Sequence, residues 1–299
     1  MTSCAASGRE VAEDATSPHH GPTLPAAESV LARSASENFP VATRLLPRGR
    51  RRHLFALYGY ARLVDYAGDE AVGDRSALLD LIAADVDRIY HGAPRIPLIR
   101  TLAPTVRECG IPPAPLHRLI EANRRDQRVR RYANVGDLLE YCAYSANPVG
   151  ELVLHVFGRA QPAEIALSDR ICTALQILEH CQDVVEDLEA DRVYLPAEDL
   201  QRFGCKESDL TAWVASPGVR RVVQLQVDRA RQLMDEGRAL LGRLPLLGRL
   251  AVAGYLAGGR ATAAAIAAAD YDVLAVDVRP RLHRVLVGWV RLTATGGAW

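Results

Sequence analysis

The chain of 299 residues is long enough for one large domain or two small ones. Its 36 basic and 36 acidic residues balance, which excludes the strong positive field of a typical nucleic-acid-binding protein. Its six cysteines are scattered without a C-x-x-C pair and we find no leader-peptide pattern, so we expect a reduced, cytoplasmic protein with buried thiols.

Residues 1–34 are rich in Ser, Ala, Pro and charge without periodicity, and we predict a disordered tail there. From Val41 onward apolar residues recur at helical spacing, and sustained period-two alternation is absent. We therefore predict one all-α domain over 35–299 with eight to ten helices. The breaks fall near 92–97, 110–115, 134, 158–162, 194–204, 217–218 and 242–245. No apolar run reaches the roughly 18 residues of a membrane span, since the longest candidate, Leu244 to Ala257, contains Arg249.

The first acidic stretch, Asp65-Tyr-Ala-Gly-Asp69-Glu70, places two aspartates on one face of a helix. At roughly 6 Å and an effective dielectric near 20, their repulsion is about 3 kcal/mol before screening, so a cation should lie between them. Tyr58 and Arg62 share that face. The other faces are apolar, which indicates a buried helix whose aspartates line an internal cavity. A solvated acidic stripe paired with Arg62 is the alternative.

The second acidic stretch, Asp183-Val-Val-Glu-Asp187, lies on a predicted helix over about Asp169 to Leu188. The residues that cluster on one side of it are Gln176, Glu179, Asp183, Glu186 and Asp187. A surface helix would usually interleave Lys or Arg among so many acids. Two such helices facing each other across a bundle core could hold two or three Mg²⁺ ions and a diphosphate, with Arg62 and Arg192 neutralising its charge.

Both stretches resemble motifs of the squalene/phytoene synthases, the head-to-head branch of the isoprenoid synthases. The matching segments are Tyr58 to Glu70, Leu175 to Asp187 followed by Asp191 to Pro196, and the small-residue segment Tyr141 to Gly150. The resemblance covers about residues 35 to 285. It implies an all-α helical bundle of the isoprenoid synthase type with a central cavity, an isoprenyl diphosphate substrate and a Mg²⁺ cofactor.

The resemblance also implies roles for individual residues. The implied metal ligands are Asp65, Asp69, Glu179, Asp183 and Asp187. The implied catalytic residues are Tyr58, Arg62, Tyr194 and Tyr255, with Arg281 or Arg284 as further donors. The implied substrate-binding residues are Arg62, Gln176, Arg192, Ser145, Ala146 and Gly150. The chain departs from the family pattern at Tyr66, where the family often has Asp, at Glu179 in place of Asn, and at Gln182 in place of Arg.

Two segments, Ser36 to Ala42 and Ser145 to Gly150, resemble the bacterial hopanoid-pathway branch of the family. That resemblance implies that the protein ionises presqualene diphosphate and captures the carbocation with water to give hydroxysqualene, beside other enzymes of the pathway. Head-to-head condensation of two farnesyl diphosphates is the alternative. A non-enzymatic helical assembly factor derived from the family is the third reading. No G-x-G-x-x-G nucleotide fingerprint is present.

Three further features complete the predictions. The basic run Arg124 to Arg131 is expected to form a solvated face or an ion-pair network rather than a phosphate site, and the role of Asp126 within it cannot be read from spacing. His180 is expected to be packed or hydrogen-bonded rather than a ligand. The stretch Leu282 to Leu292 alternates Arg and apolar residues, so it could lie on the inner face of the cell membrane or pack on the core.

Overall fold

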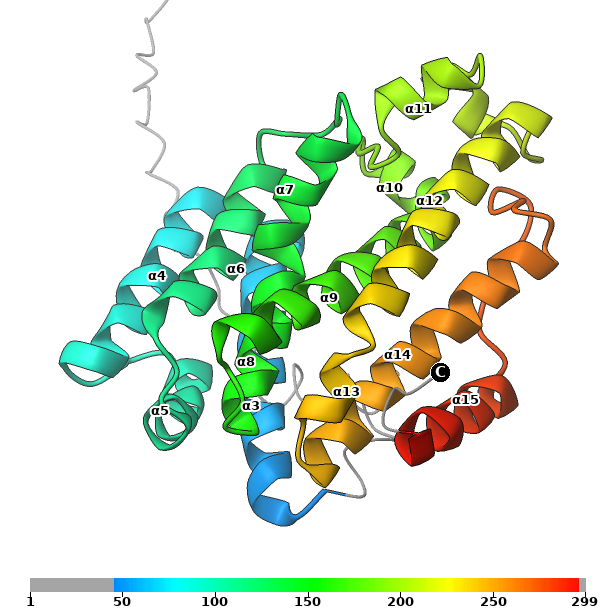
Figure 1. The fold of residues 1–299 in the computed structure, drawn as a ribbon. Helices are drawn as coiled ribbons and strands as arrows, with labels where there is room; N and C mark the ends of the chain where they lie inside the picture. The colour runs from blue at the N-terminus through cyan, green and yellow to red at the C-terminus, as the bar shows by residue number, and fades with distance from the viewer. Residues whose placement is uncertain (1–45, 296–299) are drawn as a thin grey trace, which may run out of the picture.

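The computed structural model describes residues 46–295, so the predicted tail over 1–34 and the segment Ser36 to Ala42 lie outside the described residues. Within 46–295 the chain folds into helices, and no strand is described beyond an isolated bridge between Arg131 and Val193. The prediction of an all-α protein is confirmed (Figure 1).

The N-terminal helices pack around one apolar core. They are α3 (Arg48–Asp65), α4 (Arg75–His91), α5 (Pro97–Cys109) and α6 (Pro113–Asp126). Local signals set their ends: the Asp74 side chain accepts a hydrogen bond from the amide of Ala77 at 2.9 Å, and the left-handed Gly110 ends α5. The core that they share includes the fully buried Tyr60, Leu78 and Ile120.

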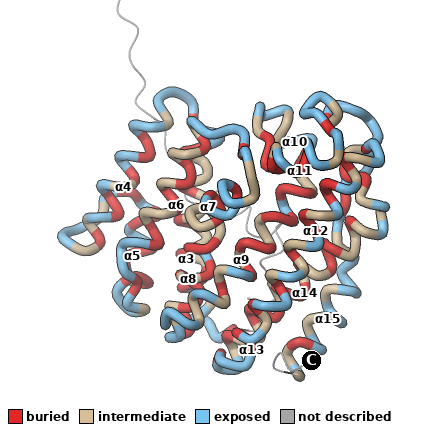
Figure 2. Tube along the Cα trace, turned by 45° about the horizontal axis from the view of Figure 1, so that its top comes forward, coloured by how far each residue is buried: buried red, intermediate tan, exposed pale blue. Residues whose placement is uncertain are grey.

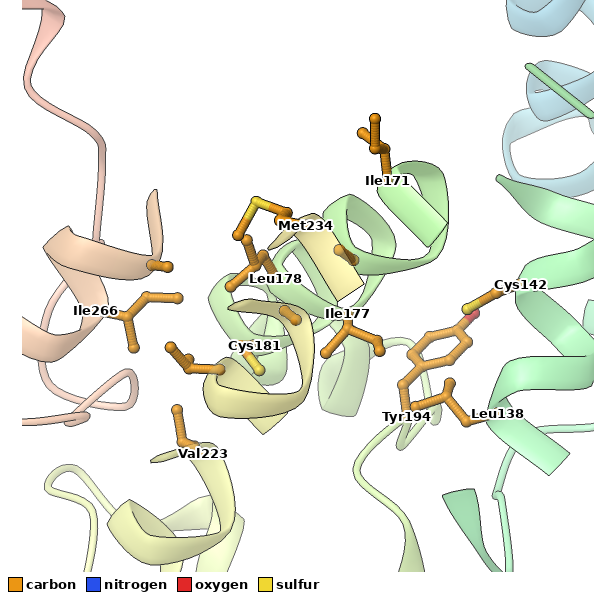
Figure 3. Packing of buried hydrophobic residues seen from close by; sticks show 14 of the residues in the cluster. Leu138, Cys142, Ile171, Ile177, Leu178, Cys181, Tyr194, Val223, Met234 and Ile266 are labelled. Atoms are coloured by element: carbon orange, nitrogen blue, oxygen red, sulfur yellow. The ribbon is translucent and has the colours of Figure 1, made fainter. Parts of the chain in front are cut away.

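The long helix α9 (Pro162–Gln182) is the centre of a second core, shown in Figure 3. Its neighbours are α7 (Val135–Ser145), α8 (Asn147–Val156), α12 (Pro217–Gly237) and α14 (Leu246–Ala268), and α15 (Leu282–Thr295) packs on α14. Short elements connect them, namely α10 (Val184–Glu189), α11 (Ala197–Arg202), the 3₁₀ turn η2 (Glu207–Thr211) and α13 (Leu240–Arg243). Ile177, Leu178 and Met234 are almost completely buried where α9 meets α12 and α14.

The described residues hold thirteen α-helices, more than the eight to ten expected. The surplus comes from the short connecting helices and from breaks that periodicity does not show. The predicted helix from Asp169 to Leu188 is wrong at both ends, because α9 begins at Pro162 and is interrupted at Asp183. Asp183 has φ −98° and ψ 19°, so the chain changes direction there before α10 begins.

The expectation that no apolar run reaches the length of a membrane span is also wrong. Helix α14 is long and apolar enough by length and composition, since the glycines and Arg249 leave its mean hydropathy high. However, 56% of its most apolar window is buried inside the protein. Apolar residues around a whole helix are equally typical of a central helix in a soluble core.

Candidate active site

An apolar cavity of about 380 Å³ lies between the two cores. Leu54, Leu57 and Leu119 line it from the N-terminal core, and Ile171 and Val252 from the second. Seven of the residues that the resemblance implied also line it: Tyr58, Ser145, Ala146, Gly150, Gln176, Glu179 and Tyr255. The fold therefore gathers residues from α3, α7, α8, α9 and α14 around one space.

Gly150 shows why this wall needs small residues. A Cβ atom at Gly150 would lie 2.3 Å from Oγ of Ser168 and 2.5 Å from Sγ of Cys172, both on α9. Asn147 and Thr173 join the same two helices by a buried hydrogen bond of 2.9 Å between their side chains. The glycine lets α8 approach α9 closely, so its first effect is on packing and its second on the shape of the cavity.

The first acidic segment does not continue as an α-helix. Helix α3 ends at Asp65, and Tyr66–Glu70 forms a π-helical turn, η1, in which the amide of Ala71 donates to the carbonyl of Tyr66 at 2.8 Å. Such turns occur frequently at functional sites. A Cβ at Gly68 would lie 1.9 Å from Oδ1 of Asn123, so glycine at this position allows η1 to pack closely against α6.

The prediction that Asp65 and Asp69 line an internal cavity is wrong for this structure. Their side chains are 48% and 44% exposed, and neither lines the central cavity. Asp65 is the last residue of α3 and Asp69 lies in η1, and both side chains are at the surface of the bundle. Arg62 lies 3.8 Å from Asp65 and donates to Glu70 at 3.3 Å, so the alternative of an acidic stripe paired with Arg62 describes this end of α3.

The second acidic segment divides between two surroundings. Glu179 lines the central cavity and two adjacent cavities, so it lies where the three spaces meet. Asp183 lines the most polar of the three, of about 770 Å³, together with Glu186, Asp277 and Arg279. Burial, together with the negative charges of Asp187 and Glu186, raises the pKa of Asp183 to about 6.

Arg192 connects the two acidic segments. Its guanidinium donates to Oδ1 of Asp69 at 2.5 Å across the bundle, although 123 residues separate them in sequence. Arg192 also lowers the pKa of the buried Asp126, which burial raises to about 6 against the opposing effect of the Tyr141 hydrogen bond. The structure thus places Asp69, Asp126 and Arg192 in one electrostatic neighbourhood.

Tyr194 lies away from the central cavity, in an aromatic cluster. Its hydroxyl donates to Oδ1 of Asp126 at 3.4 Å, and its ring stacks on His180 with centroids 3.7 Å apart. Tyr141 donates to the other oxygen of Asp126 at 2.8 Å, and Tyr132 stacks on Tyr194. His180 is packed as expected, and burial lowers its pKa.

The sequence interpretation missed the importance of Asp126. The available signal was its register on α6: Leu119, Ile120 and Asn123 are buried, and Asp126 continues their three- and four-residue spacing. The surrounding arginines form the expected ion-pair network, because each has an acidic partner. The partners are Asp80 for Arg124, Glu140 for Arg125, Glu121 for Arg128, and Asp191 for Arg130 and Arg131.

The C-terminal arginines differ from the expectation. Arg281 and Arg284 line a separate cavity against the end of α14. Arg279, which the sequence interpretation did not select, is the arginine of this segment whose charge acts on Asp183. Gln182, which replaces the family arginine, donates to the carbonyl of Val278 at 2.5 Å and ties this segment to α9.

The acidic residues suit Mg²⁺ that is also bound by substrate phosphate and water, and not Mg²⁺ bound by protein ligands alone. Oδ2 of Asp187 is buried without a hydrogen-bond partner among residues 46–295, and lies 3.7 Å from Nδ1 of His180. A buried carboxylate oxygen without a donor suits a cation. Over the same residues, no three His, Cys, Asp or Glu side chains converge closely enough to hold a metal by themselves. Mg²⁺ is usually held by one or two carboxylates, with water and substrate phosphate completing its octahedron.

Fold and site together define a helical isoprenoid synthase, and comparison with known proteins agrees. The family model of squalene/phytoene synthase matches residues 32–286, so the chain belongs to that family. A hydroxysqualene synthase from Rhodopseudomonas palustris is 34% identical over 213 residues, which are 70% of this chain and 71% of that protein. A phytoene synthase from Thermus thermophilus is 34% identical over 221 residues, which are 74% of this chain and 75% of that protein.

Solved structures support the same fold. The crystal structure of squalene synthase HpnC from Alicyclobacillus acidocaldarius aligns with a TM-score of 0.77 and 44% identity, over 82% of this chain and 94% of that one. A dehydrosqualene synthase in complex with a ligand has a TM-score of 0.81 at 21% identity, over 91% of this chain and 96% of that one, which shows the shared fold.

Proposed function

We propose that the protein is a Mg²⁺-dependent hydroxysqualene synthase that ionises presqualene diphosphate and captures the carbocation with water. The observation that carries this proposal is the apolar cavity lined by Tyr58, Ser145 and Tyr255, with the Glu179 carboxylate at its wall. An apolar space with the Glu179 carboxylate at its wall suits a prenyl chain whose diphosphate head is held through Mg²⁺. The resemblance to hydroxysqualene synthases and to HpnC favours this substrate.

The reaction begins when the bond from carbon to the diphosphate oxygen breaks and its electron pair leaves with the diphosphate. The proposed Mg²⁺ ligands are Asp65, Asp69, Glu179, Asp183 and Asp187. When bound, Mg²⁺ supplies Lewis-acid stabilisation of the charge on the leaving group. Arg192 and Arg62, which pair with Asp69 and Glu70 in this structure, are the proposed donors to that charge. Their fixed donors stabilise the developing charge without reorganisation.

The carbocation then stays in the central cavity until water attacks it. The rings of Tyr58 and Tyr255 belong to its wall and stabilise a cation through their negative faces. The oxygen of one water forms the new bond to carbon, and the proton that it loses goes to the released diphosphate or to solvent. The aliphatic wall keeps other water molecules away from the cation until this attack.

Head-to-head condensation of two farnesyl diphosphates is the second candidate. A second cavity of about 360 Å³ lies beside the first and shares Leu175, Glu179 and Tyr255 with it, which would leave room for a second chain. Relatives that are phytoene synthases favour the same reaction class. For either reaction we propose a cytoplasmic protein, since the five described cysteines are free thiols.

A product assay tests the proposal and separates the candidates. Purified protein is incubated with Mg²⁺ and either presqualene diphosphate or farnesyl diphosphate in water enriched in ¹⁸O, and the products are identified by mass spectrometry. We expect hydroxysqualene from presqualene diphosphate, heavier by about 2 Da through the oxygen of solvent water. An unlabelled hydrocarbon from farnesyl diphosphate would support condensation instead. Asp228→Asn, which changes an exposed carboxylate on α12, is the control and should react like the wild type.

A further inference from the structure

Helix α15 exposes an apolar stripe that no described part of the chain covers. The stripe consists of Leu282, Leu286, Val287 and Val290, whose exposed fractions are 63%, 40%, 50% and 62%. At about 100° per residue these four side chains fall within about 140° of one another around the helix. In Figure 2 the helix is exposed or half-buried over most of its length, and Leu292 is its one buried residue. An apolar stripe of this width normally faces a core.

A different face of α15 attaches the helix to the protein. The indole N–H of Trp289 donates to the carbonyl of Leu250 on α14 at 2.7 Å, and Leu292 is buried against the same core. A Cβ atom on Gly288 would lie 3.4 Å from Cβ of Ala257, so the two helices are already in close contact there. The exposed stripe is therefore not a core face that failed to pack. It is a second apolar surface on a helix that is already docked.

The charges next to the stripe are all positive. Arg281, Arg284 and Arg291 are exposed, and α15 contains no Asp or Glu. None of these three arginines forms an ion pair within residues 46–295, whereas every arginine from Arg124 to Arg131 has an acidic partner there. Arginines without acidic partners, next to an apolar stripe, are complementary to an anionic lipid surface. The headgroups of such a surface bind the arginines, and its acyl chains contact the apolar stripe.

The cavity beneath α15 links this surface to the candidate active site. Leu282 and Leu286 line that cavity and also belong to the exposed stripe. On its inner side the cavity shares Glu179 and Tyr255 with the central cavity. Apolar side chains thus run from the exposed face of α15 to the wall of the central cavity.

We propose that α15 docks the protein on an anionic lipid bilayer, with the apolar stripe at the acyl boundary and the arginines at the headgroups. The cavity under α15 then exchanges the long apolar chain with the bilayer. The exchange rests on the proposed function, because it needs a lipid substrate or product. The docking does not, since it follows from the stripe and the charges alone.

Vesicle sedimentation of the full chain without substrate tests the docking. Vesicles of phosphatidylcholine alone are compared with vesicles that also contain about a third phosphatidylglycerol. The double variant Val287→Asp/Val290→Asp places two negative charges in the stripe without touching the cavity wall, and Arg284→Glu/Arg291→Glu reverses the charge beside it. The control, Leu81→Asp/Val214→Asp, alters two exposed apolar residues away from α15, one on α4 and one in the loop before α12. We expect the wild type and the control to bind the anionic vesicles, and both α15 variants to lose at least about tenfold in affinity.

Several results would overturn the docking. They are a wild type that does not sediment with anionic vesicles, α15 variants that bind like the wild type, and a wild type that binds neutral vesicles equally well. Light scattering gives a further test. If the wild type is a dimer and Val287→Asp/Val290→Asp is a monomer, the stripe binds a second copy of the chain instead. Gain of vesicle binding on removal of residues 1–45 would assign it to that segment. These binding experiments use no substrate, so a protein without turnover would still give them. Membrane docking and the proposed enzymatic function can therefore be disproved independently.

Turnover measurements test the exchange. The variant Val287→Asp/Val290→Asp should convert substrate dispersed in detergent at the wild-type rate, and substrate embedded in anionic vesicles at least about tenfold more slowly. Equal loss in both assays would show a folding defect or a direct role in the reaction, and would contradict the exchange.

Discussion

Arg192, which follows the second acidic segment, donates a guanidinium N–H to the carboxylate of Asp69 in the first. The contact is 2.5 Å long and joins residues 123 positions apart. It shows that the fold brings the two segments to the same end of the bundle. The cation that like charges require is therefore supplied, in this structure, by the protein itself. In the proposed reaction the same guanidinium transfers from Asp69 to the diphosphate.

This pair gives the first prediction. Arg192→Ala should lower kcat/KM at least about a hundredfold, because one fixed donor to the leaving group disappears. The free energy of unfolding should fall by only about 1 kcal/mol, because Asp69 is nearly half exposed and such pairs contribute little. Steady-state kinetics and urea unfolding measure the two quantities. Arg130→Ala, which breaks a pair with the exposed Asp191, is the matched control and should keep kcat/KM within about threefold.

The buried Asp126 predicts a dependence of stability on pH. The folded protein holds a proton on this carboxyl up to about pH 6, whereas the unfolded chain releases it near 3.8. The folded state therefore binds more protons between these values, and the free energy of unfolding falls as pH rises through this window. Asp126→Asn should remove this decrease. The free energy of unfolding of the variant, relative to that of the wild type, should therefore rise by up to about 3 kcal/mol from pH 4 to pH 8.

Unfolding by urea in EDTA at several pH values measures this effect. EDTA removes any contribution of a divalent ion at the neighbouring carboxylates. Asp228→Asn is the control, because its side chain is more than half exposed and should give a constant difference. A difference between Asp126→Asn and the wild type that does not change with pH would contradict the raised pKa. Asp126→Asn should also slow turnover, because it replaces the carboxylate that accepts hydrogen bonds from Tyr141 and Tyr194 and so changes how these side chains are held.

Gly150 gives a prediction about packing. Gly150→Ala should lower the free energy of unfolding by about 1–3 kcal/mol, because the added methyl overlaps Ser168 and Cys172 on α9. Adding Ser168→Ala and Cys172→Ala should recover part of the loss, which chemical denaturation can measure. Gly49→Ala is the matched control on α3, where the new methyl meets nothing within 4 Å. That variant should be neutral or slightly more stable, because alanine is the better helix former.

The proposed metal site predicts linked binding of Mg²⁺ and diphosphate. Since no three acidic side chains within residues 46–295 form a site alone, Mg²⁺ by itself should raise the melting temperature only slightly. Mg²⁺ with inorganic diphosphate should raise it by several degrees, and EDTA should reverse the rise. Asp187→Asn should abolish most of it, whereas Asp209→Asn, on η2, should not. A large rise with diphosphate in EDTA would contradict metal-linked binding.

Ser145 predicts a difference between stability and activity. Its hydroxyl is buried at the cavity wall and has no hydrogen-bond partner among the described residues. Ser145→Ala should therefore leave the free protein unchanged or stabilise it by about 1 kcal/mol. KM for the diphosphate substrate should rise if the hydroxyl bonds to the substrate or to the attacking water. Unchanged kinetics together with higher stability would show that the hydroxyl has no such partner.

The sequence by itself determined the all-α fold, because helical spacing and the breaks at Gly110, Asn134 and Pro217 are local properties that the structure repeats. Its resemblance to the family indicated the segment from Ser145 to Gly150, whose small residues line the central cavity in the structure. The π turn after Asp65 was beyond it, since the turn depends on the contact of Gly68 with Asn123 on another helix.

The tertiary structure alone decided which charges meet. Spacing along the chain placed Asp65 and Asp69 on one face, but the fold paired Asp69 with Arg192 and turned Asp183 toward Asp277 and Arg279. It also buried Asp126 under two tyrosines, whereas its sequence neighbours are arginines. The physical reason is that periodicity reports which face of a helix is apolar. The partner of a charge depends on helices that are distant in sequence, and the packing of the two cores sets their positions.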